Sequence, residues 1–327
     1  MSHGLDPERL ARILTEAYPI GGARCKLEYS FVNNIYLVVT PAERHVLKVY
    51  RRNRRSPGEI AWEGDLVQHL KVRGAPVAGV LARRDGGVVT RLDMGEESRY
   101  ALMFAYAPGA KPLAPFTTDL YHQVGRAAGL FHTAAVDFTS PHSRSSMGLL
   151  ALIDEPLKAM RPTLMQMGNG HWEYASKLAV RLRAALTELA SQGLDWGVCH
   201  QDLTLDNVHV DTDGIVTIFD LDSAAPGWRA LEPQGAYHAA LSQGNDHWDA
   251  YLAGYGEVRP LHEIDVAAIP YFVLAYAFGE LAWILGKTSG STAVNRDGEL
   301  WNQRNEVEKA MGSSGWWRQW EADHLSW

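Results

Sequence analysis

Three oxygen-bearing side chains could meet within one short part of the chain. Residues 198–222 have the sequence VCHQDLTLDNVHVDTDGIVTIFDLD. Asp202 and Asn207 lie at the two ends of a polar loop, and Asp220 follows an apolar, β-branched stretch. An Asp-Gly turn between Asn207 and Asp220 predicts a β-hairpin. Because a hairpin brings its two ends together, we expect Asn207 and Asp220 to be neighbours, with Asp202 a short distance away.

These side chains suit the transfer of a phosphoryl group. Mg²⁺ is usually held by one or two carboxylate or carbonyl oxygens, and water and phosphate oxygens complete its shell. Asn207 and Asp220 can supply such oxygens. A carboxylate that stays off the metal, such as Asp202, can accept a proton from a hydroxyl group. Phosphoryl transfer needs this arrangement because its catalysis is mostly positioning and neutralisation of charge.

The order of these residues resembles that of a known family. His200, Asp202 and Asn207 match the pattern H-x-D-x-x-x-x-N of kinase-like folds, in which a strand that ends in Asp follows. The Asp-Leu-Asp sequence that begins at Asp220 resembles the aminoglycoside phosphotransferase and choline kinase superfamily more than the Asp-Phe-Gly of protein kinases. The resemblance implies that Asp202 is the catalytic base or orients the hydroxyl. It also implies that Asn207 and Asp220 bind Mg²⁺.

The same resemblance implies roles for two further residues. Asp222 would assist the metal or cap the following turn, and His200 would orient the loop backbone. Gln201 departs from the superfamily, which usually has Gly between the His and the Asp. The other interpretation of the segment is an acidic surface hairpin without chemistry, which the four matching positions in a loop-and-hairpin context make the weaker one.

A lysine on an expected strand could bind the phosphates of a nucleotide. Lys48 alternates with apolar neighbours in the strand expected at 44–50, and a lysine on a partly buried face is costly unless it is paired. The helix expected at 57–71 offers Glu59 and Glu63 on one side. The resemblance implies that Lys48 contacts the α and β phosphates and that a helix glutamate orients it. We favour Glu63, with Glu59 as the alternative; a solvated strand lysine is the interpretation without chemistry.

The chain has no G-x-G-x-x-G loop for phosphate. Its counterpart is the segment 30–36, SFVNNIY, where Asn tolerates the positive φ of a tight turn. Ser30 and Asn34 could donate hydrogen bonds to phosphate, although a tight turn alone would explain them. Phe104 and Tyr106 lie in an expected connector whose backbone would contact a purine base. The Phe104 ring would form a wall beside that base, and core packing is the simpler explanation.

The elements that must position these residues differ between the two parts of the chain. Up to residue 105, strand-like patterns dominate, at 29–39, 44–50, 88–92 and 99–105. Beyond Pro108-Gly109, helical patterns dominate, at 117–135, 148–165, 172–192, 235–253 and 263–286. The hairpin is expected at 208–210 and 215–219.

With the resemblance, these patterns predict an α+β protein with a protein-kinase-like, two-lobe fold. Residues 1–103 would form a small nucleotide-binding lobe with an antiparallel sheet and one main helix. Residues 104–109 would form the hinge, and residues 110–327 a larger, mostly helical lobe with the catalytic loop and the acceptor site. A cleft between two lobes is a common place for a ligand.

Composition excludes several classes of protein. The 327 residues are 46% hydrophobic and carry a formal net charge of −7, which fits a globular protein and argues against binding to nucleic acid. The 2 cysteines are too few for a disulfide framework and favour a cytoplasmic location. The apolar stretch 266–285 is long enough to span a bilayer, but Pro270, Gly279 and Glu280 favour a buried core helix. We therefore expect no membrane partner.

The sequence predicts a phosphotransferase that uses ATP or GTP, with Mg²⁺, and phosphorylates a hydroxyl of a small molecule. The acceptor would be an aminoglycoside, an amino alcohol, a sugar or a related metabolite, and the chain would be a monomer or a homodimer. A Ser/Thr protein kinase of the same fold is one alternative, against which the missing Gly-rich loop weighs. A non-catalytic nucleotide-binding module is another, against which the complete set of site residues weighs.

Two groups of residues leave the acceptor undefined. Acidic side chains that could bind a cationic acceptor include Glu232, Asp246, Asp249, Glu280 and Asp297. Tryptophans gather near the C-terminus, at Trp301, Trp316, Trp317, Trp320 and Trp327. Helix packing is the simplest explanation of these tryptophans, and an aromatic wall for the acceptor or a dimer contact are the alternatives.

Overall fold

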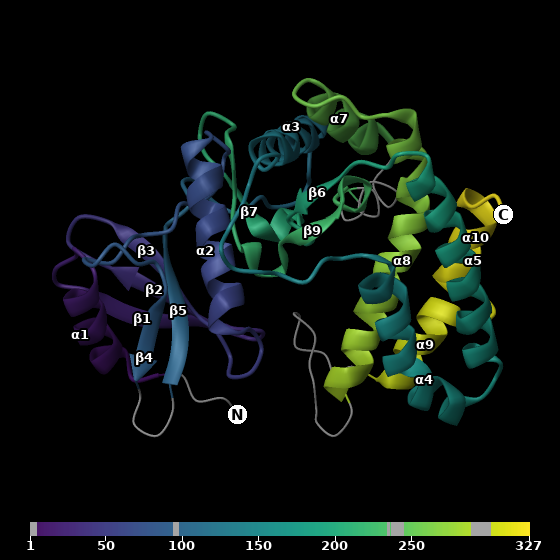
Figure 1. Ribbon diagram of the computed structural model, residues 1–327, viewed down its shortest axis with the longest axis horizontal. Coiled ribbons are helices and arrows are strands. Elements are labelled where there is room, and N and C mark those ends of the chain that lie inside the picture. The colour runs from purple at the N-terminus through teal and green to yellow at the C-terminus, as the bar shows by residue number, and fades with distance from the viewer. Residues whose placement is uncertain (1–4, 94–97, 234–235, 237–244, 289–301) are drawn as a thin grey trace. The chain divides into compact units, whose positions relative to one another are not determined.

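The structure is a computed structural model that describes residues 5–93, 98–233, 236, 245–288 and 302–327 (Figure 1). By its internal contacts the chain divides into two compact units. The first contains Met1–Arg144, Asp202–Ala224 and Asp246–Arg259, and the second contains Ser145–Gln201, Ala225–Asn245 and Pro260–Trp327. The two lobes and the hinge predicted from the sequence were defined by their expected functions, whereas these units are defined by contacts. The predicted lobes therefore stay a prediction.

The first unit contains a five-stranded antiparallel sheet in the order β1-β2-β3-β5-β4. Its strands are β1 (Arg24–Ser30), β2 (Asn34–Val39), β3 (Arg44–Val49), β4 (Thr90–Asp93) and β5 (Ser98–Ala105). The register places Lys48 of the central strand between Ile35 of β2 and Leu102 of β5. The antiparallel sheet and the α+β class that the sequence predicts are confirmed.

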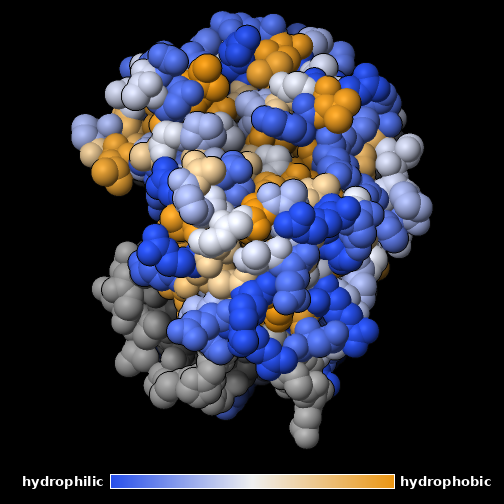
Figure 2. All heavy atoms as spheres, turned by 90° about the vertical axis from the view of Figure 1, so that its left-hand side faces the viewer, coloured by the Kyte–Doolittle hydropathy of each residue, from blue (hydrophilic) through white to orange (hydrophobic). Residues whose placement is uncertain are grey.

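Helices cover both faces of this sheet (Figure 1). The buried leucines of α1 (Pro7–Ala17) pack against the face that carries Met103 of β5. The next residue along the strand, Leu102, points the other way and lies beside Gly64 of α2 (Pro57–Val72). On the side of the molecule shown in Figure 2, hydrophobic residues form only small patches among hydrophilic ones.

Local sequence explains where α2 begins and how closely it packs. The Ser56 hydroxyl accepts a hydrogen bond from the Glu59 N–H, and the Glu59 carboxylate accepts one from the Ser56 N–H, while Pro57 occupies the first helical position. A Cβ atom at Gly64 would lie 2.7 Å from the Val88 side chain, so glycine permits the close approach of the helix. These features fix the turn of α2 that carries Glu63.

The predicted hairpin forms between β7 (Val208–Val210) and β8 (Val216–Ile218). One 3-10 turn, Leu205–Asn207, leads into it, and another, Leu221–Ser223, follows it. The hairpin is anchored where β8 pairs with Val77, just beyond α2. The hairpin and the loop that leads into it are therefore attached to the segment that follows α2 in the same unit.

Two helices of the first unit cross closely because glycines lie at the crossing. These are α3 (Thr118–Ala134) and α7 (Asn245–Gly256). A Cβ atom at Gly125 would lie 2.0 Å from the carbonyl oxygen of Tyr251, and one at Gly254 would lie 1.9 Å from the carbonyl oxygen of His122. Backbone oxygens cannot move aside unless the helix itself shifts.

The second unit is built around the long helix α8 (Glu263–Thr288). Its neighbours are the helices α4 (Glu155–Met167), α5 (His171–Ser191), α9 (Gln303–Met311) and α10 (Trp316–His324). A two-stranded antiparallel sheet joins β6 (Trp196–Cys199) to β9 (Ala225–Trp228), and short helical turns occupy Leu150–Asp154 and Arg229–Leu231. Neither of these two short strands was predicted from the sequence.

The helix α8 is the one helix of the described residues that is long and apolar enough to cross a membrane, over Glu263–Gly286. Within its most apolar window, 56% of the residues are buried. Such burial is typical of the core helix that Pro270, Gly279 and Glu280 predict. By itself, the hydropathy of this helix is weak evidence for a membrane span.

Two of the C-terminal tryptophans pack against α8. The ring of Trp317 stacks on Phe278 with the centroids 4.8 Å apart, and the indole N–H of Trp320 donates a hydrogen bond to the Pro270 carbonyl at 2.9 Å. Both tryptophans are buried. Helix packing therefore explains this pair, while Trp301, like Asp297, lies outside the described residues.

Alanine at Gly254 should destabilise the protein. We expect Gly254→Ala to lower the free energy of unfolding by about 1–3 kcal/mol, because its methyl group would overlap the backbone of α3. Gly256→Ala, in the same helix, is the control, since a Cβ atom there meets no atom within 4 Å. Urea denaturation of both variants measures the difference. Equal stability of the two variants would contradict the close crossing.

Candidate active site

A buried lysine connects the sheet, α2 and the hairpin of the first unit. Lys48 is 2% exposed, and its Nζ donates hydrogen bonds to Glu63 Oε1 at 2.5 Å and to Asp220 Oδ1 at 2.9 Å. Glu63 is fully buried, and its Oε2 accepts a hydrogen bond from the Tyr50 hydroxyl at 2.8 Å. Of the two glutamates that the sequence left open, Glu63 is the one that meets Lys48.

The carboxylates keep Lys48 charged in spite of its burial. Burial by itself lowers the pKa of a lysine, but Asp220, Glu63 and Asp222 hold the pKa of Lys48 above its ordinary value. Burial raises the pKa of Glu63, and the nearby Lys48 opposes that shift. Removing either partner would leave an uncompensated charge inside the protein, which is strongly unfavourable. The cation and the anion therefore depend on each other.

Glu59 has a different position from Glu63. Its Oε2 accepts hydrogen bonds from the Ser56 N–H at 2.9 Å and from the Ser56 hydroxyl at 3.0 Å, and its Oε1 accepts one from Arg55 at 3.3 Å. Glu59 thus closes the N-terminus of α2 and does not contact the lysine.

The hairpin brings three of the predicted site residues together. The Phe219 N–H donates to the Asn207 carbonyl at 3.0 Å, so Asn207 lies beside the residue that precedes Asp220. The Asn207 amide nitrogen donates to the backbone carbonyl of Asp202 at 2.8 Å and to its Oδ2 at 3.0 Å. Asp220 has φ +61°, which turns the backbone sharply at the end of β8.

Asn207 and Asp220 each carry a side-chain oxygen of the kind that a divalent cation prefers. The amide nitrogen of Asn207 is directed at Asp202. The amide oxygen of Asn207, Oδ1, therefore points away from this hydrogen bond. Asp220 gives one oxygen to Lys48, and its side chain is 44% exposed, so the carboxylate is accessible. Such hard oxygen donors suit Mg²⁺ and Ca²⁺, which complete their shells with water and phosphate.

A cavity of about 270 Å³ lies against Lys48 and Asp220. Its walls are mostly apolar and include the side chains of Phe104, Tyr106, Val46, His209 and Phe219. The guanidinium of Arg44 lies 4.1 Å from the centre of the Tyr106 ring and holds that ring in place. The charged residues of its lining are Glu28, Lys48 and Asp220. Apolar walls with a lysine among them suit a flat, phosphorylated ligand.

Ser30 and Asn34 face each other across the turn between β1 and β2. The Ser30 hydroxyl donates a hydrogen bond to Asn34 Oδ1 at 2.9 Å, and Asn34 is 1% exposed. These contacts match the turn-stabilising alternative that the sequence left open. The turn itself is formed by residues 31–33, and neither Asn33 nor Asn34 has the positive φ that the sequence led us to expect.

Asp222 lies among arginine side chains. Its side chain is 6% exposed, Oδ2 accepts hydrogen bonds from Arg54, and Oδ1 accepts one from Arg55. Both carboxylate oxygens are therefore directed at arginines rather than toward an open site. A metal-binding role for Asp222 would require these arginines to leave. The sequence has a run of basic residues at 51–55, RRNRR, but does not show which carboxylate these arginines would meet.

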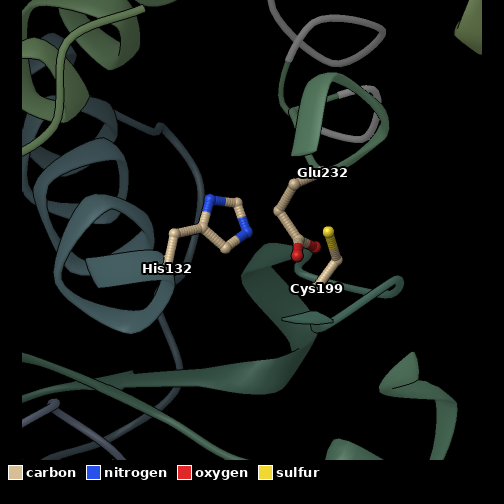
Figure 3. A group of neighbouring side chains, drawn as sticks. All are labelled: His132, Cys199 and Glu232. Atoms are coloured by element: carbon tan, nitrogen blue, oxygen red, sulfur yellow. The ribbon is translucent and has the colours of Figure 1, made fainter. Parts of the chain in front are cut away.

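In the second unit, Glu232 holds the backbone just before Asp202. Its carboxylate accepts hydrogen bonds from the N–H groups of His200 and Gln201, the second at 3.0 Å. Glu232 is 3% exposed, and Figure 3 shows it beside Cys199. Figure 3 also draws His132, whose Nδ1 is hydrogen-bonded to the Tyr255 hydroxyl at 2.8 Å within the first unit. Glu232, one of the acidic residues considered for acceptor binding, therefore anchors the loop.

Gln201 shows why this position usually carries Gly in the superfamily. Its φ is +70°, in the left-handed region that is unfavourable for residues with a Cβ atom. It is 4% exposed, and within the described part of the chain neither atom of its amide has a hydrogen-bond partner. A Cβ atom at Gly227 would lie 2.7 Å from Gln201 Nε2, so the side chain packs against that glycine of β9.

The sequence model of a family described as the phosphotransferase enzyme family matches residues 29–261, which include Lys48 and the whole segment 198–222. The chain belongs to this family. It is a small-molecule phosphotransferase, as the resemblance predicted. It is 38% identical over 299 residues to an uncharacterized protein of Deinococcus radiodurans, covering 88% of this chain and 84% of the relative. It is 28% identical over 271 residues to a homoserine kinase of Rhodospirillum rubrum, covering 78% of each.

Solved structures share the kinase-like fold. A microcompartment-associated aminopropanol kinase superposes with a TM-score of 0.71 at 24% identity, covering 94% of this chain and 95% of the other. An amicoumacin kinase in complex with AMP-PNP, Ca²⁺ and amicoumacin superposes with a TM-score of 0.74 at 18% identity, covering 94% of both chains. At these identities the likeness establishes the fold.

Replacing Gln201 by an apolar residue of similar size should stabilise the protein. We expect Gln201→Met to raise the free energy of unfolding by about 1–3 kcal/mol, the usual cost of a buried polar group without a partner. Gln201→Gly is the companion variant, since it removes the backbone strain but leaves a cavity beside Gly227. Urea denaturation measures both. Destabilisation by Gln201→Met would mean that the amide has a hydrogen-bond partner such as a bound water.

Proposed function

We propose that this phosphotransferase moves the γ-phosphate of ATP to the hydroxyl group of a small amino alcohol. The observation that carries the proposal is the contact of Lys48 with Glu63 and Asp220 at the wall of the apolar cavity. A nucleoside triphosphate needs apolar walls for its base and a cation for its phosphates, and the first unit offers both at one place.

The donor would lie in the cavity with its base near Phe104 and Tyr106. Lys48 would contact the α and β phosphates, and Glu63 would keep the ammonium group oriented through their hydrogen bond. The amicoumacin kinase that shares the fold was crystallised with AMP-PNP, an analogue of ATP, which supports ATP as the donor. GTP is the alternative.

The hairpin residues would act on the γ-phosphate and on the acceptor. Asn207 and Asp220 would hold Mg²⁺, which when bound neutralises charge on the phosphates. Asp202 would orient the acceptor hydroxyl and accept its proton as the new P–O bond forms. The Asn207 amide supports this role because it donates to Asp202 and so holds the carboxylate in place.

Two comparisons support an acceptor that carries an amine and a hydroxyl. Homoserine kinases match this chain at 26–28% identity, and one structural neighbour is an aminopropanol kinase. Homoserine and aminopropanol are both small and flexible, and in each a hydroxyl lies a few bonds from an amine. Aminoglycosides and sugars are larger acceptors of the same reaction class.

Substitution of the two aspartates should abolish transfer and leave the fold intact. We expect Asp202→Asn and Asp220→Asn each to lower kcat by about 10³-fold or more, because positioning and charge neutralisation supply most of the catalysis. Asp213→Asn, at the exposed turn of the same hairpin, should keep full activity. The assay is ADP release over a panel of amino alcohols, homoserine, aminoglycosides and sugars, with mass spectrometry of the product. Full turnover by either variant would contradict the mechanism.

Chelation of divalent cations should stop the reaction reversibly. We expect EDTA to abolish ADP release, because the phosphate charge would no longer be neutralised, and excess Mg²⁺ to restore it. Equal turnover in EDTA would exclude the proposed use of Asn207 and Asp220 as ligands of a required metal. A parallel series with Mn²⁺ and Ca²⁺ measures the choice of cation.

A further inference from the structure

Asp222 accepts hydrogen bonds from several separate segments of the first unit. Arg54 donates to Oδ2 at 2.6 Å and 3.2 Å, and Arg55 donates to Oδ1 at 3.3 Å and to the Asp222 carbonyl oxygen at 2.7 Å. Asn33, in the β1–β2 turn, donates to Oδ2 at 3.3 Å. Arg144 donates to the carbonyl oxygen at 2.6 Å.

These donors connect Asp222 to the elements around the lysine. Arg144 also donates to the Glu59 carbonyl of α2 at 2.9 Å, and it lies 3.8 Å from Glu63 Oε2. Arg55 precedes α2 and also pairs with Glu59. One residue therefore ties together the β1–β2 turn, the start of α2 and the end of the β7–β8 hairpin.

The surroundings of Asp222 favour a charged carboxylate that stays with its arginines. Its side chain is 6% exposed, and Arg54 and Arg55 donate hydrogen bonds to its two oxygens. A carboxylate that is buried and hydrogen-bonded on both oxygens is costly to expose. By contrast, the carboxylate of Asp220 is 44% exposed.

We propose that Asp222 is a positioning residue and not a metal ligand. It holds the β1–β2 turn and α2 so that Glu63 meets Lys48 before the nucleotide arrives. Arg54 and Arg55 act with it, because the link exists only while the carboxylate and the guanidinium groups are paired. The inference rests on one part of the proposed function, which is that the protein binds an adenine nucleotide together with a divalent cation.

The test measures nucleotide binding without an acceptor. AMP-PNP is titrated by calorimetry into the wild type, Asp222→Asn, Arg54→Gln and the double variant, first at saturating Mg²⁺ and then at a series of Mg²⁺ concentrations. We expect each single variant to weaken AMP-PNP binding about tenfold, the usual size of coupling between linked groups. The double variant should bind no more weakly than the singles, and the Mg²⁺ concentration for half-maximal binding should not change. Arg12→Gln, at an exposed position of α1, is the control.

Two outcomes would overturn the proposal. If Asp222→Asn raises the Mg²⁺ requirement while Arg54→Gln does not, Asp222 binds the metal. If the effects of the two substitutions add, Arg54 contacts the nucleotide independently of Asp222. Should Asp222→Asn fail to fold by circular dichroism, Asn33→Ala takes its place, since it removes a single donor to the carboxylate. Binding of AMP-PNP does not require an acceptor, so failure to find an acceptor would affect the proposed function and not this inference.

Discussion

The site depends on keeping one ammonium group charged in the interior of the first unit. Lys48 is 2% exposed, and a lone lysine would lose its proton there. It stays charged because Glu63 and Asp220 lie within hydrogen-bond distance. These partners come from α2 and from the end of the hairpin, so the sheet, the helix and the hairpin must meet at one point.

Two residues that flank Asp202 and Asn207 in the sequence adopt backbone conformations that are unfavourable in isolation. Asp220 and Gln201, on either side of the segment that carries Asp202 and Asn207, both have positive φ angles. Such strain persists only where surrounding contacts hold it. In the first unit, Lys48 holds the side chain of Asp220. In the second, the carboxylate of Glu232 binds the N–H groups of His200 and Gln201.

Sequence reasoning succeeded where the relevant contacts are local. The Asp-Gly turn predicts the hairpin, and its register brings Asn207 beside the end of β8. The alternation around Lys48 predicts a strand with the lysine on one face. The same reasoning missed β6 and β9, because each has only 4 residues and is paired with a strand distant in sequence. It left Asp222 open between a role at the metal and a cap of the following turn, since nothing local shows that Arg54 and Arg55 will reach it.

The sequence by itself determined the fold class and the family, because these follow from local spacing and from a motif of contiguous residues. It also predicted a set of residues for the chemistry. The tertiary structure decided which partner each carboxylate meets. The carboxylates of the site have nearly the same intrinsic chemistry, so they differ only in their burial and in the cation or N–H group that each one meets. They are Asp220, Asp222, Glu59, Glu63 and Glu232. The partner of Glu63, Lys48, is 15 residues away in the sequence, and the partner of Asp222, Arg54, is 168 residues away. Only folding brings residues so far apart in the sequence into contact.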